Sequence, residues 1–427
     1  MENIKTHNAW TATEKITFRF FFVFFSLFII IDNNGAFPFW EIFFKYPLDL
    51  LHVFIPWVGK SILHLQNDVT IFTNGSGDTT YDYVIVFTIF SLSTIATIIW
   101  SAVDRKRDNY LVLYYWLTAA IRYYVALMLF SYGLIKVIKL QFPSPALYRL
   151  VEPYGDSSPM GLAWTFLGFS SGYNFFMGIA EVAALLLLFR RTMVLGCIIV
   201  LMATSNVMAV NYFYDVPVKI LSTALFVMTF FLLSHDLKRL LQFLLTDGPV
   251  NLPVIAKPQF ARPWIAKAGL AFKFILIGTT LVMGFIQAAD GVREYGEGAP
   301  KPGLYGLYYV NTFVLGKDTL PPLTTDTVRW RLLRIEWPGF ASVRMMSDSA
   351  RGFKMTLDST AHRIELQASS GPRIYKFHYT SPTADQLYLQ GSANNDSIFI
   401  SFKKKLPKDF RLMNRGFHWV NERPFNR

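Results

Sequence analysis

The stretch GIAEVAALLLLFRR, Gly178–Arg191, decides the fold class, because it places a carboxylate ahead of an apolar run that closes with two arginines. A run of this composition is typical of a helix that crosses a lipid bilayer. An ionisable side chain inside such a helix is costly unless it is paired, hydrated or protonated. The stretch therefore predicts a membrane helix, and it raises the question of what Glu181 contacts.

The composition of the whole chain favours a membrane protein. The 427 residues are 52% hydrophobic and only 16% charged, whereas soluble globular chains carry about 25% charged residues. The formal net charge is +12, but no compact Lys/Arg block with interleaved aromatic residues accompanies it, so we expect no nucleic-acid partner. The single cysteine, Cys197, excludes an intramolecular disulfide, a CxxC pair and an all-cysteine iron–sulfur site.

Several segments are long and apolar enough to span a bilayer, which needs about 20 mostly apolar residues per helix. Seven are predicted: residues 16–33, 81–103, 111–139, 168–189, 192–213, 216–234 and 269–288. Basic residues gather on one side of this alternating arrangement, so the positive-inside rule places the N-terminus in the cytoplasm. The aromatic segment 37–65, interrupted by charges and prolines, is expected to lie along the outer interface as one or two amphipathic helices.

The predicted organisation has five parts. They are N-terminal spans with outer interfacial helices (1–110), a four-helix bundle (111–245), a Pro-rich cytoplasmic linker (246–268), a last span (269–289) and an extracytoplasmic β domain (290–427). From residue 327 onward, short runs with alternating apolar positions recur about every ten residues, separated by turn-forming residues. This pattern predicts an all-β domain, either a small antiparallel barrel or a sandwich.

The C-terminal stretch NRGFHWVNERPFNR, Asn414–Arg427, combines Arg, Asn and aromatic residues. One interpretation is a polar anchor that plugs the barrel or docks on the outer face of the bundle. The other is a short closing strand with a solvated tail. The anchor would be formed by Arg415, His418, Trp419, Asn421, Glu422 and Arg427.

Two charged residues are predicted to meet inside the membrane. Arg122 and Glu181 lie about 12 and about 9 residues from the cytoplasmic ends of their spans, so a rise of 1.5 Å per residue puts them at nearly the same depth. We predict that Arg122 and Glu181 pair and lock the third and fourth spans together. Whether the pair only fixes the helix register or takes part in function is left open.

Further polar residues fall in the outer halves of the spans. Lys136 is expected to extend its ammonium group to the outer interface. A small-molecule cavity that opens outward is one interpretation of this group, and interhelical hydrogen bonds are the other. The residues that would line the cavity are Lys136, Asn174, Asn206, Asn211 and Tyr214. All seven histidines fall outside the span interiors, so neither a haem nor another metal site is expected.

The stretch IRYYVALMLFSYGLIKVIK, Ile121–Lys139, followed by Gly178–Val210, resembles the DoxX-like membrane proteins. The matching positions are Arg122, Gly133, Lys136, Glu181 and Arg190, and the likeness covers about residues 111–240. The resemblance implies a four-helix bundle in the inner (cytoplasmic) membrane of a bacterium. It also implies a link, in some members, to quinone-linked sulfur oxidation or to redox-stress complexes.

Two functions are therefore expected. The first is a quinone- or lipid-interacting subunit of a redox or envelope complex, in which Arg122 and Glu181 position a headgroup or relay a proton and the β domain docks an extracytoplasmic protein partner. The second is a non-catalytic membrane anchor that presents the β domain as an interaction module. Since no catalytic motif is recognisable, we expect an accessory subunit rather than a stand-alone enzyme.

Overall fold

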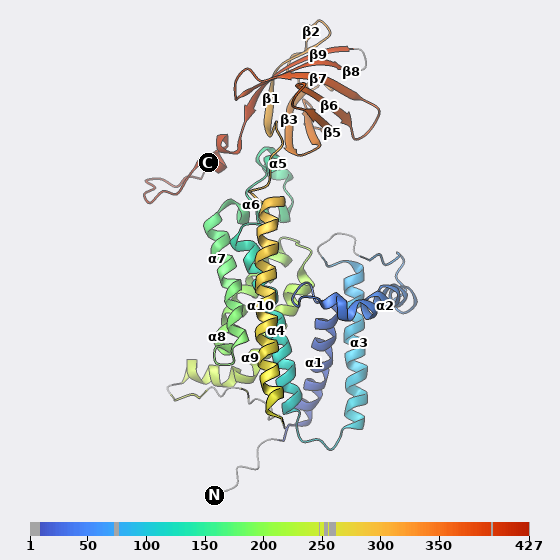
Figure 1. Ribbon diagram of the computed structural model, residues 1–427, viewed down its shortest axis with the longest axis vertical. Helices are drawn as coiled ribbons and strands as arrows, with labels where there is room; N and C mark the ends of the chain where they lie inside the picture. The colour runs from blue at the N-terminus through green and yellow to red at the C-terminus, as the bar shows by residue number, and fades with distance from the viewer. Residues whose placement is uncertain are drawn as a thin grey trace. The chain divides into compact units, whose positions relative to one another are not determined.

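The computed structural model describes residues 9–71, 77–246, 248–251, 255, 262–393 and 396–426. The chain forms two compact units: a helical unit, Met1–Phe142 with Ser158–Val292, and a β unit, Pro143–Ser157 with Arg293–Arg427. In Figure 1 the helical unit runs from blue to yellow, and the strands of the β unit are orange to red. The chain therefore passes between the two units three times.

Long helices form the helical unit. They are α1 (Ala12–Ile31), α2 (Trp40–Ser61), α3 (Thr80–Val103), α4 (Leu111–Val137), α6 (Pro159–Phe169), α7 (Ser171–Val182), α8 (Met193–Phe213), α9 (Lys219–Leu245) and α10 (Pro263–Glu294). A 3-10 helix, η2 (Ala183–Leu188), continues α7. Helix α4 is the centre of this unit, since every side chain of Tyr124–Phe130 is buried. A helix that is apolar on all sides has to be covered on all sides.

Six described helices are long and apolar enough to cross a membrane: α3, α4, α7 with η2, α8, α9 and α10. The predicted number of seven is one too high. Helix α1 does form where the first span was predicted. It is not among the six because Glu14, Lys15 and Arg19 lie within its first turns and make it too highly charged.

Some predicted boundaries differ from those of the structure. Helix α9 continues to Leu245, beyond the predicted end of its span, and α10 begins at Pro263, within the predicted linker. Residues 247, 252–254 and 256–261 of that linker lie outside the described residues. The predicted amphipathic segment 37–65 forms one helix, α2, which contains Pro47 and Pro56.

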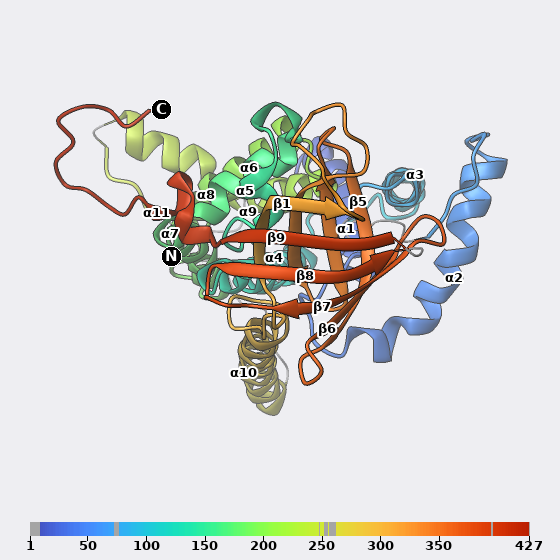
Figure 2. The ribbon, with the colours of Figure 1, turned by 90° about the horizontal axis from the view of Figure 1, so that it is seen from above.

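The β unit is an eight-strand antiparallel barrel. Its strands are β1 (Gly306–Leu315), β3 (Trp330–Trp337), β4 (Phe340–Met345), β5 (Ala350–Asp358), β6 (Arg363–Ala368), β7 (Ile374–Thr380), β8 (Gln386–Ala393) and β9 (Asp396–Lys405), and a two-residue β2 (Asp318–Thr319) is added to β1. Consecutive barrel strands pair, and β1 also pairs with β9, which closes the sheet. Figure 2 shows β1, β9, β8 and β7 side by side. The closing pair distinguishes a barrel from a sandwich, so the barrel prediction is confirmed.

Large side chains fill the barrel. Trp330 is almost fully buried and packs edge-on against Tyr375 and Phe377, with ring centroids 5.3 and 6.1 Å away. The segment that follows α4 also belongs to this unit: it forms α5 (Leu147–Val151) and the 3-10 turn η1 (Tyr154–Asp156). Leu147 is buried with Leu307 and Leu332 of the barrel.

The C-terminal motif neither plugs nor closes the barrel. The barrel interior is filled by its own strands, and β1 is the closing strand. Trp419 is 90% exposed, and the guanidinium of Arg415 bonds to Asn421 Oδ1 and stacks over Phe425 within the motif itself. The other motif residues, His418 and Glu422, are exposed, and Arg427 lies outside the described residues. Plugging of the barrel and closure of the barrel by this motif are therefore wrong, and docking on the helical bundle stays a prediction.

Candidate functional site

Two glycines bring α4 and α7 into backbone contact. A Cβ atom on Gly133 would lie 2.7 Å from Gly178 O, and one on Gly178 would lie 2.6 Å from Gly133 O. Val182 is next to Gly133 and Val137 is next to Gly178, so the two helices run antiparallel. Small residues at such a crossing allow helices in a bilayer to approach closely. This contact fixes which faces of α4 and α7 meet.

The ion pair at the crossing joins Lys136 and Glu181, each three residues beyond its glycine. Lys136 Nζ donates to both carboxylate oxygens of Glu181 at 2.7 Å. The two side chains are only 6% and 4% exposed. The ammonium also lies 5.7 Å from the centroid of the Tyr132 ring and 5.9 Å from that of Phe142, which adds cation–π attraction. Burying a charge is costly, so the loss of either partner would leave the other as an uncompensated buried charge.

The predicted pairing of Arg122 with Glu181 is wrong, and so is the predicted extension of Lys136 to the interface. Arg122 Nε donates instead to the carbonyl of Leu187 at 2.6 Å. Equal depth along two helices does not determine which sides face each other, and the Gly133–Gly178 contact turns Lys136 toward Glu181. The prediction found the right carboxylate but gave it the wrong cation.

Arg122 is one of three side chains that satisfy the end of η2. Thr192 Oγ1 donates to Leu186 O at 2.7 Å and Lys273 Nζ donates to Leu188 O at 2.8 Å, beside the Arg122–Leu187 bond. The last carbonyls of a helix have no partners within it and need donors from elsewhere. Arg122 of α4 and Lys273 of α10 thereby fix the end of η2, which continues the helix that carries Glu181.

A cavity of about 350 Å³ borders the ion pair within the helical unit. Of the residues predicted to line it, Lys136, Asn206 and Asn211 do so, together with Glu181. The rest of the wall is mostly apolar and comes from α4, α6, α8 and α9; examples are Leu129, Met160, Trp164, Val207 and Leu225. A small cleft with few polar groups on an apolar wall has the usual make-up of a ligand site.

Two predicted cavity residues have other positions. Asn174 is fully buried and donates to Leu167 O at 2.7 Å and Ser170 O at 3.1 Å, so it joins α6 to α7. The hydrogen-bond alternative is right for Asn174. Tyr214 follows the end of α8, is 39% exposed and does not line the cavity.

Residue Gln141, which the sequence analysis missed, also lines the cavity. Its Oε1 atom is buried and has no hydrogen-bond partner among the described residues. Gln141 follows the end of α4, and the sequence gives no sign that the chain turns back there. Buried amide oxygens are usually paired, so this atom leaves room for a donor from a ligand.

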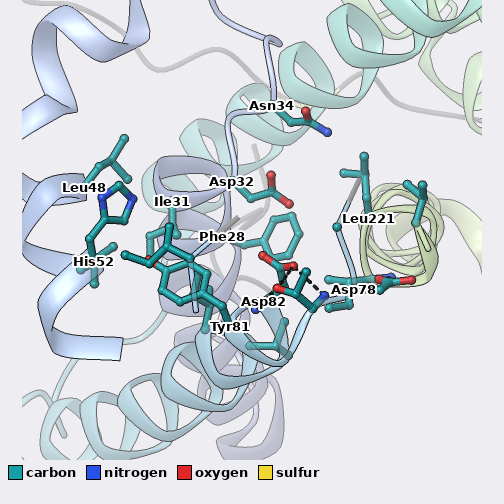
Figure 3. Close-up of a pocket in the computed structure, with 18 of the residues that line it drawn as sticks. Phe28, Ile31, Asp32, Asn34, Leu48, His52, Asp78, Tyr81, Asp82 and Leu221 are labelled. Atoms are coloured by element: carbon teal, nitrogen blue, oxygen red, sulfur yellow. Dashed lines mark hydrogen bonds between the residues drawn. The ribbon is translucent and has the colours of Figure 1, made fainter. Parts of the chain in front are cut away.

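A second cavity, of about 590 Å³, lies where α1 ends and where α3 and α9 begin, with α2 along one side (Figure 3). Asp32, Asp78, Asp82 and His52 line it, and Leu221 lines both cavities. The sequence analysis did not select these carboxylates, because they fall at helix ends and resemble ordinary loop charges. In the part of the chain that the structure describes, no group of three His, Cys, Asp or Glu side chains is arranged to hold a metal ion.

Comparison with known proteins gives a relative in Bacillus subtilis. The "Uncharacterized protein YwoB" of Bacillus subtilis (strain 168) is 38% identical over 125 residues, which cover 28% of this chain and 77% of YwoB. The chain belongs to the YwoB family. No family model matches the chain, and no solved structure matches it. Since the name YwoB states no ligand or reaction, function has to be argued from the site.

Proposed function

We propose that this protein is a DoxX-like integral membrane protein whose helical unit binds a quinone or a lipid in the cavity beside Lys136 and Glu181. The observation that carries the proposal is the position of a buried ion pair on the wall of an otherwise apolar cavity. Ionisable groups at membrane depth are costly and are most often kept for ligand or proton pathways.

The polar groups of the cavity suit a headgroup. Lys136 has three N–H donors, and two carboxylate oxygens of Glu181 accept from it, so one donor remains for a quinone carbonyl or a lipid phosphate oxygen. Gln141 Oε1 offers an acceptor, and the rings of Tyr132 and Phe142 beside the ammonium offer flat apolar surfaces. The apolar wall would take the ring or the chain of the ligand. Glu181 would hold the Lys136 ammonium in the position from which it donates to the headgroup.

The connections between the two units support crossing of a membrane by the helices. The segment 143–157 and the chain beyond Arg293 belong to the same β unit. Four candidate spans, α7 with η2, α8, α9 and α10, lie between them. An even number of crossings returns the chain to its starting side, as a single β unit requires. With the positive-inside rule, this side is outside the inner membrane of a bacterium.

In this proposal the barrel serves a protein partner rather than a ligand, because aromatic side chains fill its interior. The protein would then be an accessory subunit of a redox or envelope complex. The same packed interior favours a second candidate function, a non-catalytic anchor that presents the barrel as an interaction module. The two candidates differ in whether the helical cavity is occupied.

The test uses protein solubilised from its own membrane in a mild detergent. Bound quinone and lipid are measured by native mass spectrometry and by extraction. The variant is the double substitution Lys136→Met with Glu181→Gln, which removes both charges and leaves neither buried alone. The matched control is Lys219→Met with Asp215→Asn, a pair at 2.9 Å outside this cavity.

Wild type and control are expected to carry about one quinone or lipid per chain, and the double variant is expected to lose it while it keeps its helical circular dichroism. An empty wild type, or a folded double variant that keeps its ligand, would reject the proposal and favour the anchor.

A further inference from the structure

Acidic residues outnumber basic ones among the described residues that line the second cavity, which is about 590 Å³ in volume. Its acidic residues are Asp32, Glu41, Asp49, Asp78 and Asp82, and its one lysine is Lys45. Lys45 Nζ already pairs with Asp49 at 2.8 Å along α2. The cavity therefore keeps an excess of carboxylates.

Two of these carboxylates serve the starts of helices. Asp78 accepts hydrogen bonds from the backbone N–H groups of Lys219 at 2.6 Å and Ile220 at 3.0 Å, at the start of α9. Asp82 accepts from the backbone N–H of Thr79 at 2.8 Å in the capping box of α3. The positive end of a helix dipole stabilises an anion at this position. Asp78 and Asp82 thus have a structural role at the starts of α9 and α3.

Asp32 has no such compensation. It follows Ile31, the last residue of α1, where the helix dipole presents its negative end. The described residues provide no hydrogen-bond donor or cation for its carboxylate. Burial, and then the charge of Asp82, raise the pKa of Asp32 to about 6. Figure 3 shows the Asp32 carboxylate at the cavity, near that of Asp82. A cationic ligand would provide the missing partner.

The rest of the wall selects the kind of cation. Apolar and aromatic side chains, among them Phe28, Ile31, Tyr81 and Leu221, line much of the cavity. The volume lies in the range of small-molecule pockets and far exceeds that of a bare ion. Aromatic rings attract organic ammonium groups through cation–π contacts. Since the described residues form no metal-ligand group, an organic cation fits better than a metal ion.

We propose that this cavity binds an organic cation with an apolar body, held with its charge beside Asp32 and Asp82 and its body against Phe28, Tyr81 and Leu221. Helix α2 forms one wall and presents Glu41, Lys45, Asp49 and His52 to the ligand. The site is separate from the Lys136–Glu181 ion pair and does not depend on the quinone or lipid proposal.

The experiment is equilibrium dialysis of the purified full chain in detergent micelles with labelled tetraphenylphosphonium as the probe. Asp32→Asn removes the charge at nearly constant volume, and Leu48→Trp reduces the space without changing any charge. Asp215→Asn is the control, because Asp215 is an exposed carboxylate that does not line the cavity. Triphenylphosphine oxide, which is neutral and similar in shape, is the competitor.

Wild type and Asp215→Asn are expected to bind the probe saturably with equal affinity. Asp32→Asn and Leu48→Trp are each expected to weaken binding at least about tenfold, which is about 1.4 kcal/mol, and the neutral competitor is expected to have no effect. If Asp32→Asn fails to fold, Leu48→Trp decides. The proposal is overturned if wild type shows no saturable binding, if the folded cavity variants bind as well as wild type does, or if the neutral compound displaces the probe.

Discussion

Removal of one member of the Lys136–Glu181 pair should destabilise the helical unit far more than removal of both. In Lys136→Met, the Glu181 carboxylate loses the donor of its two hydrogen bonds, both 2.7 Å long, while the side chain stays 4% exposed. A buried charge left without its partner costs about 3–5 kcal/mol. Glu181→Gln removes the negative charge beside the ammonium of Lys136, which stays buried without a counter-ion. The double variant leaves no buried charge, so we expect its stability to return to within about 1 kcal/mol of wild type.

The assay is a double-mutant cycle of the unfolding free energy, measured by denaturant titration of the full chain in mixed micelles. The expected coupling energy is several kcal/mol, larger than pairs on exposed surfaces give. The control cycle on Lys219 and Asp215, where the aspartate side chain is 84% exposed, should give about 1 kcal/mol or less. If the two single substitutions at Lys136 and Glu181 simply add in the double variant, the buried pair is not what stabilises the crossing of α4 and α7.

Three further predictions concern single residues. Gly133→Ala should lower the unfolding free energy by about 1–3 kcal/mol, because the new Cβ would overlap the backbone of α7. The control is Gly278→Ala, where nothing lies within 4 Å of the new Cβ. It should raise the unfolding free energy slightly in the same denaturant titration. Arg122→Met should cost about 1–3 kcal/mol, because a carbonyl of η2 loses its donor, and hydrogen exchange of the η2 amides should speed up. Burial raises the pKa of Glu336 above its ordinary value, so the folded barrel binds a proton more readily than the unfolded chain does. Barrel stability should therefore fall as the pH rises through that raised pKa, and Glu336→Gln should flatten this dependence in hydrogen exchange of β3 measured against pH.

The helical part of the fold follows from sequence because a spanning helix needs only length and apolar composition. The strands from β3 onward also follow, since their apolar positions alternate. Strand β1 was missed because its burial does not alternate: Gly306, Leu307 and Tyr308 are buried in succession. A strand that closes a barrel is defined by its partners β3 and β9, and these partners are distant in sequence.

The candidate site was predictable in its residue types and not in its contacts. Glu181 and Lys136 stand out because they are charges within apolar runs. Their pairing depends on the rotation of two helices about their axes, and the contact of Gly133 with Gly178 sets that rotation. Asp32 and Asp82 come together only because α1 ends beside the start of α3, and no periodicity within either helix encodes that proximity.

Buried polar groups of the helical unit differ in how their hydrogen bonds are satisfied and in whether they line a cavity. Arg122 donates to Leu187 O, and that bond explains its position. Asn174 donates to Leu167 O and Ser170 O, but its Oδ1 atom is buried without a partner among the described residues. Gln141 Oε1 is likewise buried and unpaired among the described residues, but unlike Asn174 it lines the cavity beside Lys136. The Asp32 carboxylate, whose pKa is raised by burial, lines the second cavity. The two cavities share the lining residues Asn34, Val218 and Leu221. Leaving a buried amide oxygen unpaired is costly, so in the proposed function a ligand donor would pair with Gln141 Oε1. In the second proposal an organic cation would pair with the Asp32 carboxylate.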